Sequence, residues 1–272
     1  MTSKAHRSVV GRAFNSVTMN LRIPSILHFL LYCTAFSHED SVTCGEQWQP
    51  RIAYCMGGAP RSLGHPFVYN SILHHAILGI GGRAYIFALL KLKDPGRHYI
   101  GGVPPVPHNA TRLERALSAL NPVKFVELEE NIPIRYPKCY TRQGRKLPLP
   151  GYFRFKNLLK DQLQMFATYS KCVSVITEYE IEHNIRFDYV ARLRPDVAWF
   201  ERSPAWCNLP LNKSVVRFHP SRDNFWISRR DITFHSFNAL KYICSLKSKD
   251  GAAEDLIDHS LRIGKFNITD LH

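Results

Sequence analysis

The residues best suited to charge chemistry lie in the segment Phe187–Val197, which reads Phe-Asp-Tyr-Val-Ala-Arg-Leu-Arg-Pro-Asp-Val. Its apolar residues predict a buried strand, in which alternate side chains point to the same face, so Arg192 and Arg194 share one face. Two arginines on one face of a buried strand are costly unless they are paired or face a ligand. Pro195 stops the hydrogen-bonding ladder and leaves Asp196 at the carboxyl end of the strand. A carboxylate there could hold a divalent metal, Mn²⁺ or Mg²⁺, which would neutralise a diphosphate.

The same segment also has a purely structural interpretation. Arg192 or Arg194 could form an ion pair with Asp196 or Asp188 and serve only the scaffold. Because the residue types fit both interpretations, the sequence leaves a binding site and a structural ion pair open.

A glycine pair follows the strand expected over 51–56 and is a second candidate site. Gly57 and Gly58 let the backbone approach a phosphate closely, and Arg61 supplies a positive charge nearby. Parallel sheets bind ligands beyond the carboxyl ends of their strands, which is where this turn would lie. The segment matches neither the GxxxxGK loop nor the GxGxxG fingerprint, and a tight turn with a solvated arginine also explains it.

Two later segments carry residues suited to sugar binding and proton transfer. Asp223 and Asn224 could bind sugar hydroxyls, and Trp226 could stack on the apolar face of a sugar ring. Glu254, at the start of the helix expected over 252–262, could act as a base, as could Asp223. The structural alternatives are a turn followed by a core strand, and acidic residues that offset a helix dipole.

These candidates need a sheet to bring them together, and the hydrophobic pattern of the chain predicts one. The expected strands are 51–56, 84–92, 123–128, 187–193, 215–218 and 224–227, and the expected helices are 67–78, 111–120, 154–184, 231–245 and 252–262. Alternating strands and helices predict an α/β domain with a mainly parallel sheet. Residues 184–230 hold strands without a helix between them, which predicts some antiparallel strands. Thr111 is the expected N-cap of its helix, and residues 131–153 are expected to form a long loop.

The chain is strongly basic for a protein of 272 residues. It has 36 Lys and Arg against 22 Asp and Glu, a formal net charge of +14. With 45% hydrophobic and 21% charged residues, the composition excludes disorder, collagen and a multi-span membrane protein as the main state. A basic surface suits nucleic acid, anionic lipid or an anionic small molecule. Nucleic acid is not an expected partner, because no basic helix with interleaved aromatic residues occurs.

An apolar run near the N-terminus, Ile23–Phe36, predicts an export signal. The run has 14 residues, fewer than the roughly 20 that span a membrane. A small-x-small cleavage site lies at the end of the run, at Ala35-Phe36-Ser37, as in secretory signals. An uncleaved membrane anchor and a non-exported tail are the alternatives. The expected organisation is therefore a signal or anchor over 1–37 and a single domain over 38–272.

Cysteines and glycosylation triplets also favour the secretory pathway. Six cysteines follow the apolar run, at 44, 55, 139, 172, 207 and 244, and an even number suits disulfides. Their spacing contains no CxxC, so a zinc knuckle is not expected, and buried free thiols are the alternative. Asn-x-Ser/Thr triplets start at Asn109, Asn212 and Asn267, which should then lie on the surface. We expect the lumen or membrane of the ER or Golgi, or secretion.

The order of these motifs resembles a known family. Gly-Gly-x-Pro-Arg-Ser after the first strand, the Arg-x-Arg-Pro-Asp block, Asp-Asn-Phe-Trp-Ile-Ser-Arg-Arg and a late Ala-Glu-Asp-Leu are similar to eukaryotic and algal proteins related to GT-A-fold glycosyltransferases. The resemblance covers roughly residues 50–264, and the Arg-x-Arg-Pro-Asp block is its most specific part.

The resemblance implies a Rossmann-like nucleotide-sugar domain whose first-strand loop holds the nucleotide. It would place Asp196 where the family has its metal-binding aspartate. The usual signature is Asp-x-Asp, and here Arg194 stands in the first position. Arg194 could then neutralise the diphosphate directly and take over part of the work of the metal.

The expected function is a glycosyltransferase that moves a sugar from a nucleotide-diphosphate donor to a glycan or protein acceptor. The charge on the leaving group would be stabilised by Asp196 with a metal, or by Arg61, Arg192 and Arg194. The alternative is an inactive carbohydrate-binding or scaffold protein that kept the fold and lost the metal site. The missing second aspartate supports that alternative.

Overall fold

The structure is a computed structural model that describes most of the chain after residue 47. The described residues are Cys44, 48–93, 109–129, 156–212, 214–218, 225–239, Tyr242 and 253–271. They all belong to one compact unit, Val42–His272. The expected signal or anchor over 1–37 and the expected loop over 131–153 lie outside these residues.

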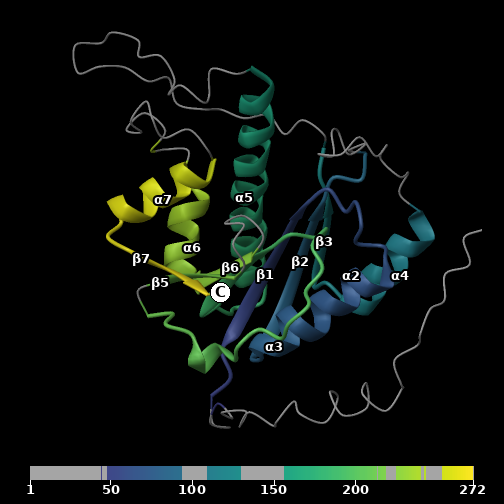
Figure 1. The fold of residues 1–272 in the computed structure, drawn as a ribbon, viewed down its shortest axis with the longest axis horizontal. Coiled ribbons are helices and arrows are strands. Elements are labelled where there is room, and N and C mark those ends of the chain that lie inside the picture. Colours follow the sequence, from purple (N-terminus) through teal and green to yellow (C-terminus); the bar gives the residue numbers. More distant parts are fainter. Residues whose placement is uncertain are drawn as a thin grey trace, which may run out of the picture. The chain divides into compact units, whose positions relative to one another are not determined.

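Seven strands form one mixed sheet in the order β3-β2-β1-β4-β6-β5-β7 (Figure 1). The strands are β1 (Arg51–Gly58), β2 (Arg83–Leu90), β3 (Lys124–Glu127), β4 (Tyr189–Leu193), β5 (Ser214–Phe218), β6 (Phe225–Arg229) and β7 (Asn267–Leu271). Among these seven, β6 runs antiparallel to its neighbours β4 and β5, and the other pairs are parallel. The predicted mainly parallel α/β fold is confirmed, and its antiparallel strand lies in the region 184–230.

Helices cover both faces of the sheet. They are α2 (Pro66–Ser71), the π-helix η1 (Ile72–Ile77), α3 (Leu78–Ile80), α4 (Ala110–Leu120), α5 (Lys156–Glu182), α6 (Arg230–Phe237) and α7 (Ala253–Ile263), with a 3₁₀ turn η3 (Trp206–Asn208). The helices α2, η1, α3 and α4 pack on one face, and α5, α6 and α7 pack on the other (Figure 1). Both faces of the sheet are therefore buried, which explains why its central strands read as continuous apolar runs.

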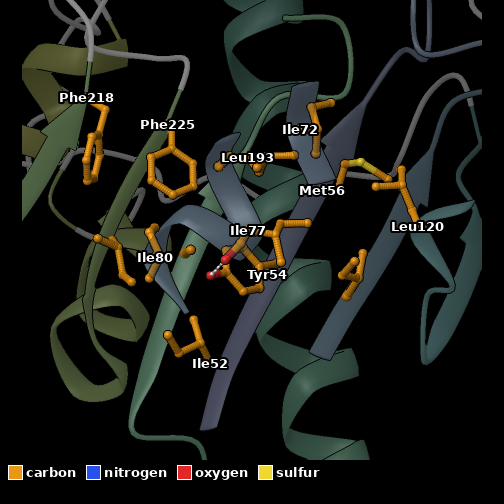
Figure 2. Packing of buried hydrophobic residues seen from close by; sticks show 14 of the residues in the cluster. Ile52, Tyr54, Met56, Ile72, Ile77, Ile80, Leu120, Leu193, Phe218 and Phe225 are labelled. Atoms are coloured by element: carbon orange, nitrogen blue, oxygen red, sulfur yellow. Dashed lines mark hydrogen bonds between the residues drawn. The ribbon is translucent and has the colours of Figure 1, made fainter. Parts of the chain in front are cut away.

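The first face packs against the segment 66–80. Tyr54 and Met56 of β1 lie among Ile72, Ile77 and neighbouring apolar side chains (Figure 2). The Tyr54 hydroxyl donates to the Ile77 carbonyl at 3.5 Å. Burial raises the pKa of Tyr54, so the ring stays neutral and fixes this helical segment against β1.

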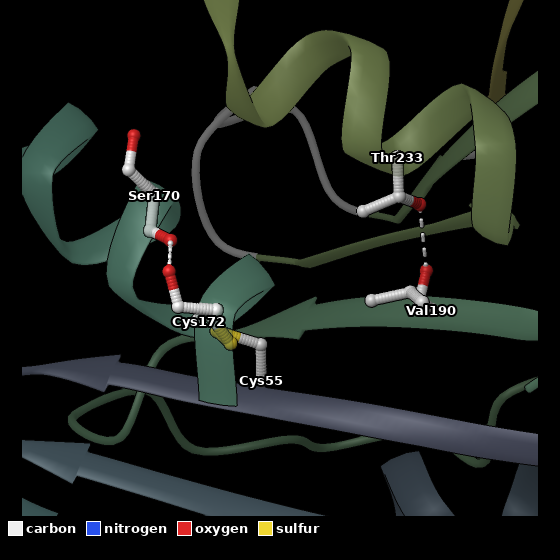
Figure 3. Close-up of a disulfide and its surroundings, with 6 residues drawn as sticks. Cys55, Ser170, Cys172, Val190 and Thr233 are labelled. Carbon is white, nitrogen blue, oxygen red and sulfur yellow. Dashed lines mark hydrogen bonds between the residues drawn. A yellow bond between two sulfur atoms is a disulfide. The ribbon is translucent and has the colours of Figure 1, made fainter. Parts of the chain in front are cut away.

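The second face is held by packing and by covalent and polar links. Cys55 of β1 forms a disulfide with Cys172 of α5 (Figure 3). The Thr233 hydroxyl of α6 donates to the Val190 carbonyl of β4 at 3.1 Å (Figure 3). These links join α5 to β1 and α6 to β4, the two strands at the centre of the sheet.

Several boundaries differ from the sequence expectation. The helix expected over 231–245 ends at Phe237, where the Asn238 side chain donates to the Phe234 carbonyl and competes with the helical backbone. The N-cap of α4 is Asn109 and not Thr111. Strand β7 was not expected, because five partly polar residues at an edge give a weak strand pattern.

The predicted disulfides are confirmed by two pairs, Cys44–Cys207 and Cys55–Cys172. Disulfides persist in oxidising compartments, so they indicate such a compartment for this chain. Cys139 and Cys244 lie outside the described residues. In the part of the chain that the structure describes, none of the helices combines the length and apolarity needed to cross a bilayer.

We predict that the double variant Cys55→Ala/Cys172→Ala unfolds at lower urea concentration than the wild type. The disulfide closes a sequence separation of 117 residues, so its loss should cost about 5 kcal/mol of unfolding free energy by the loop-entropy relation. Urea denaturation followed by circular dichroism measures this change, and reduction of the wild type should lower its midpoint as well. Equal midpoints for variant and oxidised wild type would contradict the prediction.

Candidate functional site

The candidate site lies where the strand order of the sheet reverses. From β1 the chain continues to β2 on one side, whereas β4 lies on the other side of β1. Because β1 and β4 are parallel neighbours, their carboxyl ends meet at one edge. In open α/β sheets, ligands bind in the crevice outside such a switch point. Arg61 follows β1, and Arg194 and Asp196 follow β4; we call these three residues the switch-point cluster.

The switch-point cluster is joined by short hydrogen bonds. Arg194 donates from Nε to Oδ1 and from Nη2 to Oδ2 of Asp196, each at 2.9 Å. Arg61 donates from Nη1 to Oδ2 of the same carboxylate at 2.9 Å. The Ser62 hydroxyl donates to the Asp196 carbonyl, also at 2.9 Å. The loop after β1 and the loop after β4 are therefore held together by one aspartate.

The carboxylate is buried while the guanidinium groups reach the solvent. The Asp196 side chain is 7% exposed, against 32% for Arg61 and 28% for Arg194. Burial alone would raise the pKa of Asp196, but the hydrogen bonds and charges of Arg194 and Arg61 outweigh it and hold the pKa below its ordinary value. Asp196 is thus ionised at neutral pH, and the three groups together carry one net positive charge.

The glycine pair at the end of β1 is required by the local geometry. Gly58 has a φ of 134°, a backbone conformation that L-residues with a side chain rarely adopt. A Cβ on Gly57 would lie 2.7 Å from Cγ2 of Thr168, because α5 approaches β1 closely there. The packing of α5 therefore explains Gly57, and the turn into the Arg61 loop explains Gly58. A role in phosphate binding stays a prediction for both.

Lys91 is a basic residue at the same edge that the sequence reasoning missed. It follows β2, and its backbone N–H donates to the Gly58 carbonyl at 3.0 Å. Its buried Nζ donates to Oε1 of Gln164 on α5 at 3.2 Å. The expected strand over 84–92 placed Lys91 inside the sheet, whereas β2 ends at Leu90. The available signal was a lysine directly after an apolar run.

Two of the expected site residues lie in the core. Arg192 is buried beside α5, with its guanidinium carbon 4.9 Å from the centroid of the Tyr169 ring. Trp226 pairs with Arg192 in the sheet and packs against Phe237 with the ring centroids 5.1 Å apart. Trp226 is buried, so its ring offers no open face to a sugar, and we do not assign it to the site. Arg192 is thus buried whereas the Arg194 side chain is 28% exposed, and a role of Arg192 in binding stays a prediction.

Three further candidates cannot be placed from the described residues. Asp223 and Asn224 lie outside them, and Glu254 lies in the first turn of α7 with only its backbone described. Phe225, the first residue of β6, pairs with Leu193 at the end of β4. Strand β6 therefore starts at the edge that carries Arg194. The roles expected for Asp223, Asn224 and Glu254 stay predictions.

The described residues do not fit a divalent metal at Asp196. Both carboxylate oxygens already accept guanidinium N–H groups, so a cation would have to approach against two positive charges. Among the described residues, no group of three or more His, Cys, Asp or Glu side chains could hold a metal ion. Among the described residues, Asp196 is an ion-pair partner of Arg61 and Arg194, and a metal at this position stays a prediction.

No family model and no curated protein matches the chain. Among the solved structures that match is a "putative nucleotide-diphospho-sugar transferase" from Desulfovibrio desulfuricans G20. The match has 9% sequence identity and a TM-score of 0.36, and it covers 82% of this chain and 80% of that chain. This low similarity concerns the arrangement of helices and strands and does not by itself assign an activity.

We predict that Asp196→Asn lowers the unfolding free energy by about 1–3 kcal/mol at pH 7, because two guanidinium groups lose a charged acceptor. The matched control is Asp231→Asn, whose carboxylate pairs with Arg229 at 3.3 Å on the surface and should change stability little. Thermal denaturation of both variants measures the difference.

The difference in unfolding free energy between the wild type and Asp196→Asn should depend on pH. A carboxyl group whose pKa is lowered by folding stabilises the protein above its ordinary pKa of 3.8, and this stabilisation disappears as the pH falls below that value. The difference in unfolding free energy between wild type and Asp196→Asn should therefore be largest at pH 7 and become smaller below about pH 4. If this difference in unfolding free energy stayed constant down to pH 3, it would contradict an ionised Asp196 in the switch-point cluster.

Proposed function

We propose that the switch-point cluster binds the diphosphate of a nucleotide sugar, and that the chain transfers this sugar to a glycan or protein acceptor. The observation that carries the proposal is the position of Arg61 and Arg194, which follow two adjacent parallel strands at the point where the strand order reverses. The low similarity to a protein named as a nucleotide-diphospho-sugar transferase is compatible with it.

The chemistry needs a positive environment for the leaving group. When the bond between sugar and diphosphate breaks, negative charge develops on the phosphate oxygens, and guanidinium groups stabilise it best where they are held in place beforehand. Arg194 is held by a two-point hydrogen bond to Asp196, and Arg61 by a single one. Asp196 thus acts as a positioning residue in this proposal. Lys91 lies at the same edge, with its buried Nζ bound to Gln164.

An exposed aromatic pair, with one ring at the start of α2 and the other in the loop after β4, could contact another part of the ligand. The rings of Phe67 and Phe200 lie 5.7 Å apart and are 51% and 80% exposed. Phe67 follows the Arg61 loop, and Phe200 follows Asp196 by four residues. Aromatic rings beside charged groups suit ligands that combine a ring with a phosphate, so the base or the sugar could stack here.

The remaining parts of the proposal rest on the sequence. Glu254 or Asp223 would remove the proton from the acceptor hydroxyl, as expected from their positions in the resembling motifs. Transferase activity in the lumen of the ER or Golgi would agree with the two disulfides. The net charge of +14 would attract anionic donors over long distances.

A second candidate function is a binding protein without transferase activity. The observation that favours it is the engagement of both Asp196 oxygens by arginines, as in a scaffold ion pair. Such a protein would still bind a nucleotide or a carbohydrate. Incubation with a panel of nucleotide sugars, with and without Mn²⁺, separates the two, because only an enzyme releases the nucleoside diphosphate.

We predict that a nucleoside diphosphate raises the melting temperature of the protein in a thermal-shift screen of UDP, GDP and CMP. The double variant Arg61→Gln/Arg194→Gln should bind the same nucleotide about 10²–10⁴-fold more weakly, because each of the two lost charged hydrogen bonds contributes about 1.5–3 kcal/mol. The control is Arg229→Gln, which changes a half-exposed arginine outside the cluster.

Two results would contradict the proposed site. One is equal nucleotide affinity in wild type and double variant, provided that both are folded by circular dichroism. The other is equal weakening by Arg229→Gln, which would indicate that overall charge and not the switch-point cluster sets the affinity. A wild type that binds none of the three nucleotides at millimolar concentration would contradict a donor site of this class.

A further inference from the structure

The glycosylation triplet at Asn109 has no part in the proposed site, yet the structure gives its side chain a distinct environment. Asn109 is the N-cap residue of α4 and is exposed to solvent. Its Oδ1 accepts a hydrogen bond from the backbone N–H of Arg112 at 3.0 Å. This bond fixes which side of the amide faces the helix and leaves the other side, Nδ2, directed away from that backbone N–H.

We propose that Asn109 carries an N-linked glycan, with Oδ1 capping α4 while Nδ2 holds the sugar. The residues of the triplet are Asn109, Ala110 and Thr111, all of them exposed, and none is proline. The two disulfides indicate an oxidising compartment for the chain, and the secretory pathway, where such triplets are modified, is one. The proposal does not depend on the proposed transferase function.

The co-reactant is an oligosaccharide linked to a lipid diphosphate. Nδ2 of Asn109 forms a bond to C1 of the first sugar, and the bond between C1 and the phosphate oxygen breaks. The lipid diphosphate leaves with that electron pair, and the amide nitrogen loses one proton. Because Oδ1 takes no part in the new bond, the hydrogen bond that caps α4 can persist in the modified protein.

The other two triplets lie in different surroundings. Asn212 and Asn267 are also exposed, but Asn267 pairs in register with Ser214, two residues after Asn212. Glycans at both positions would stand at the same edge of the sheet and crowd each other. Asn109 belongs to a separate helix on the face covered by α2 and α4, so its modification is independent of that edge.

The test is translation of the full chain with ER-derived microsomes, followed by gel electrophoresis before and after removal of N-glycans by an amidase. The deciding variants are Thr111→Ala and Thr111→Ser. Both keep Asn109 and its hydrogen bond to Arg112, whereas only Thr111→Ala destroys the triplet. Asn70→Gln is the control, because Asn70 is exposed at a helix and lies outside any triplet.

We expect Thr111→Ala to carry one N-glycan fewer than the wild type, seen as a smaller mobility shift when the amidase removes the glycans. Thr111→Ser and Asn70→Gln should keep the wild-type pattern. A wild type without any amidase-sensitive species, or a Thr111→Ala variant with the full number of glycans, would overturn the proposal. Since neither variant at 111 removes the helix cap, a failure to fold cannot imitate the expected result.

Discussion

The ion pairs of Asp196 with Arg61 and Arg194 connect the two halves of the sheet at the edge that carries the proposed site. Arg61 and Asp196 are 135 residues apart in sequence, yet their side chains meet at 2.9 Å. The meeting depends on β4 lying directly beside β1 in parallel, which requires both faces of these strands to be buried under helices. The Cys55–Cys172 disulfide and the Tyr54 hydroxyl each fix β1 to one of those layers. The site thus depends on the central strands being held from both sides.

This arrangement makes Asp196 the ion-pair partner of two arginines. As a metal ligand it would need open oxygens and further acidic neighbours, whereas its carboxylate is shared between two guanidinium groups. Arg194 stands two residues before Asp196, and its guanidinium group donates to both oxygens of that carboxylate. The cost of burying the carboxylate is offset by two charged partners, and the arginines are fixed in return. Positive charge held in place is what a diphosphate site without a metal requires.

The arrangement of a sheet between two layers of helices could be predicted from the spacing of hydrophobic residues, because the central strands and α5 have a regular apolar pattern. The position of Asp196 beside the Arg61 loop followed from two parallel strands and a proline. Trp226 could not be placed, because in a sheet covered on both faces an apolar strand gives no sign of which side chains face solvent. Lys91 was missed because the expected strand ended at residue 92, two residues beyond the end of β2. The π-helix η1 was not expected, because its sequence has no pattern that distinguishes it from an α-helix. The Arg194–Asp196 ion pair was one of the alternatives that the sequence left open, because the two residues are close in the chain. The contact of Arg61 with Asp196 was not foreseen, because it depends on the conformations of two loops 135 residues apart.

The central claim is that Arg61 and Arg194 together form a diphosphate site at the switch point. A crystal structure of the protein grown with the nucleoside diphosphate that stabilises it most would test this directly. The claim predicts phosphate oxygens within hydrogen-bond distance of both guanidinium groups, with the Asp196 carboxylate still bound to Arg194. A nucleotide bound at the opposite edge of the sheet, or a bound diphosphate that contacts neither arginine, would contradict it.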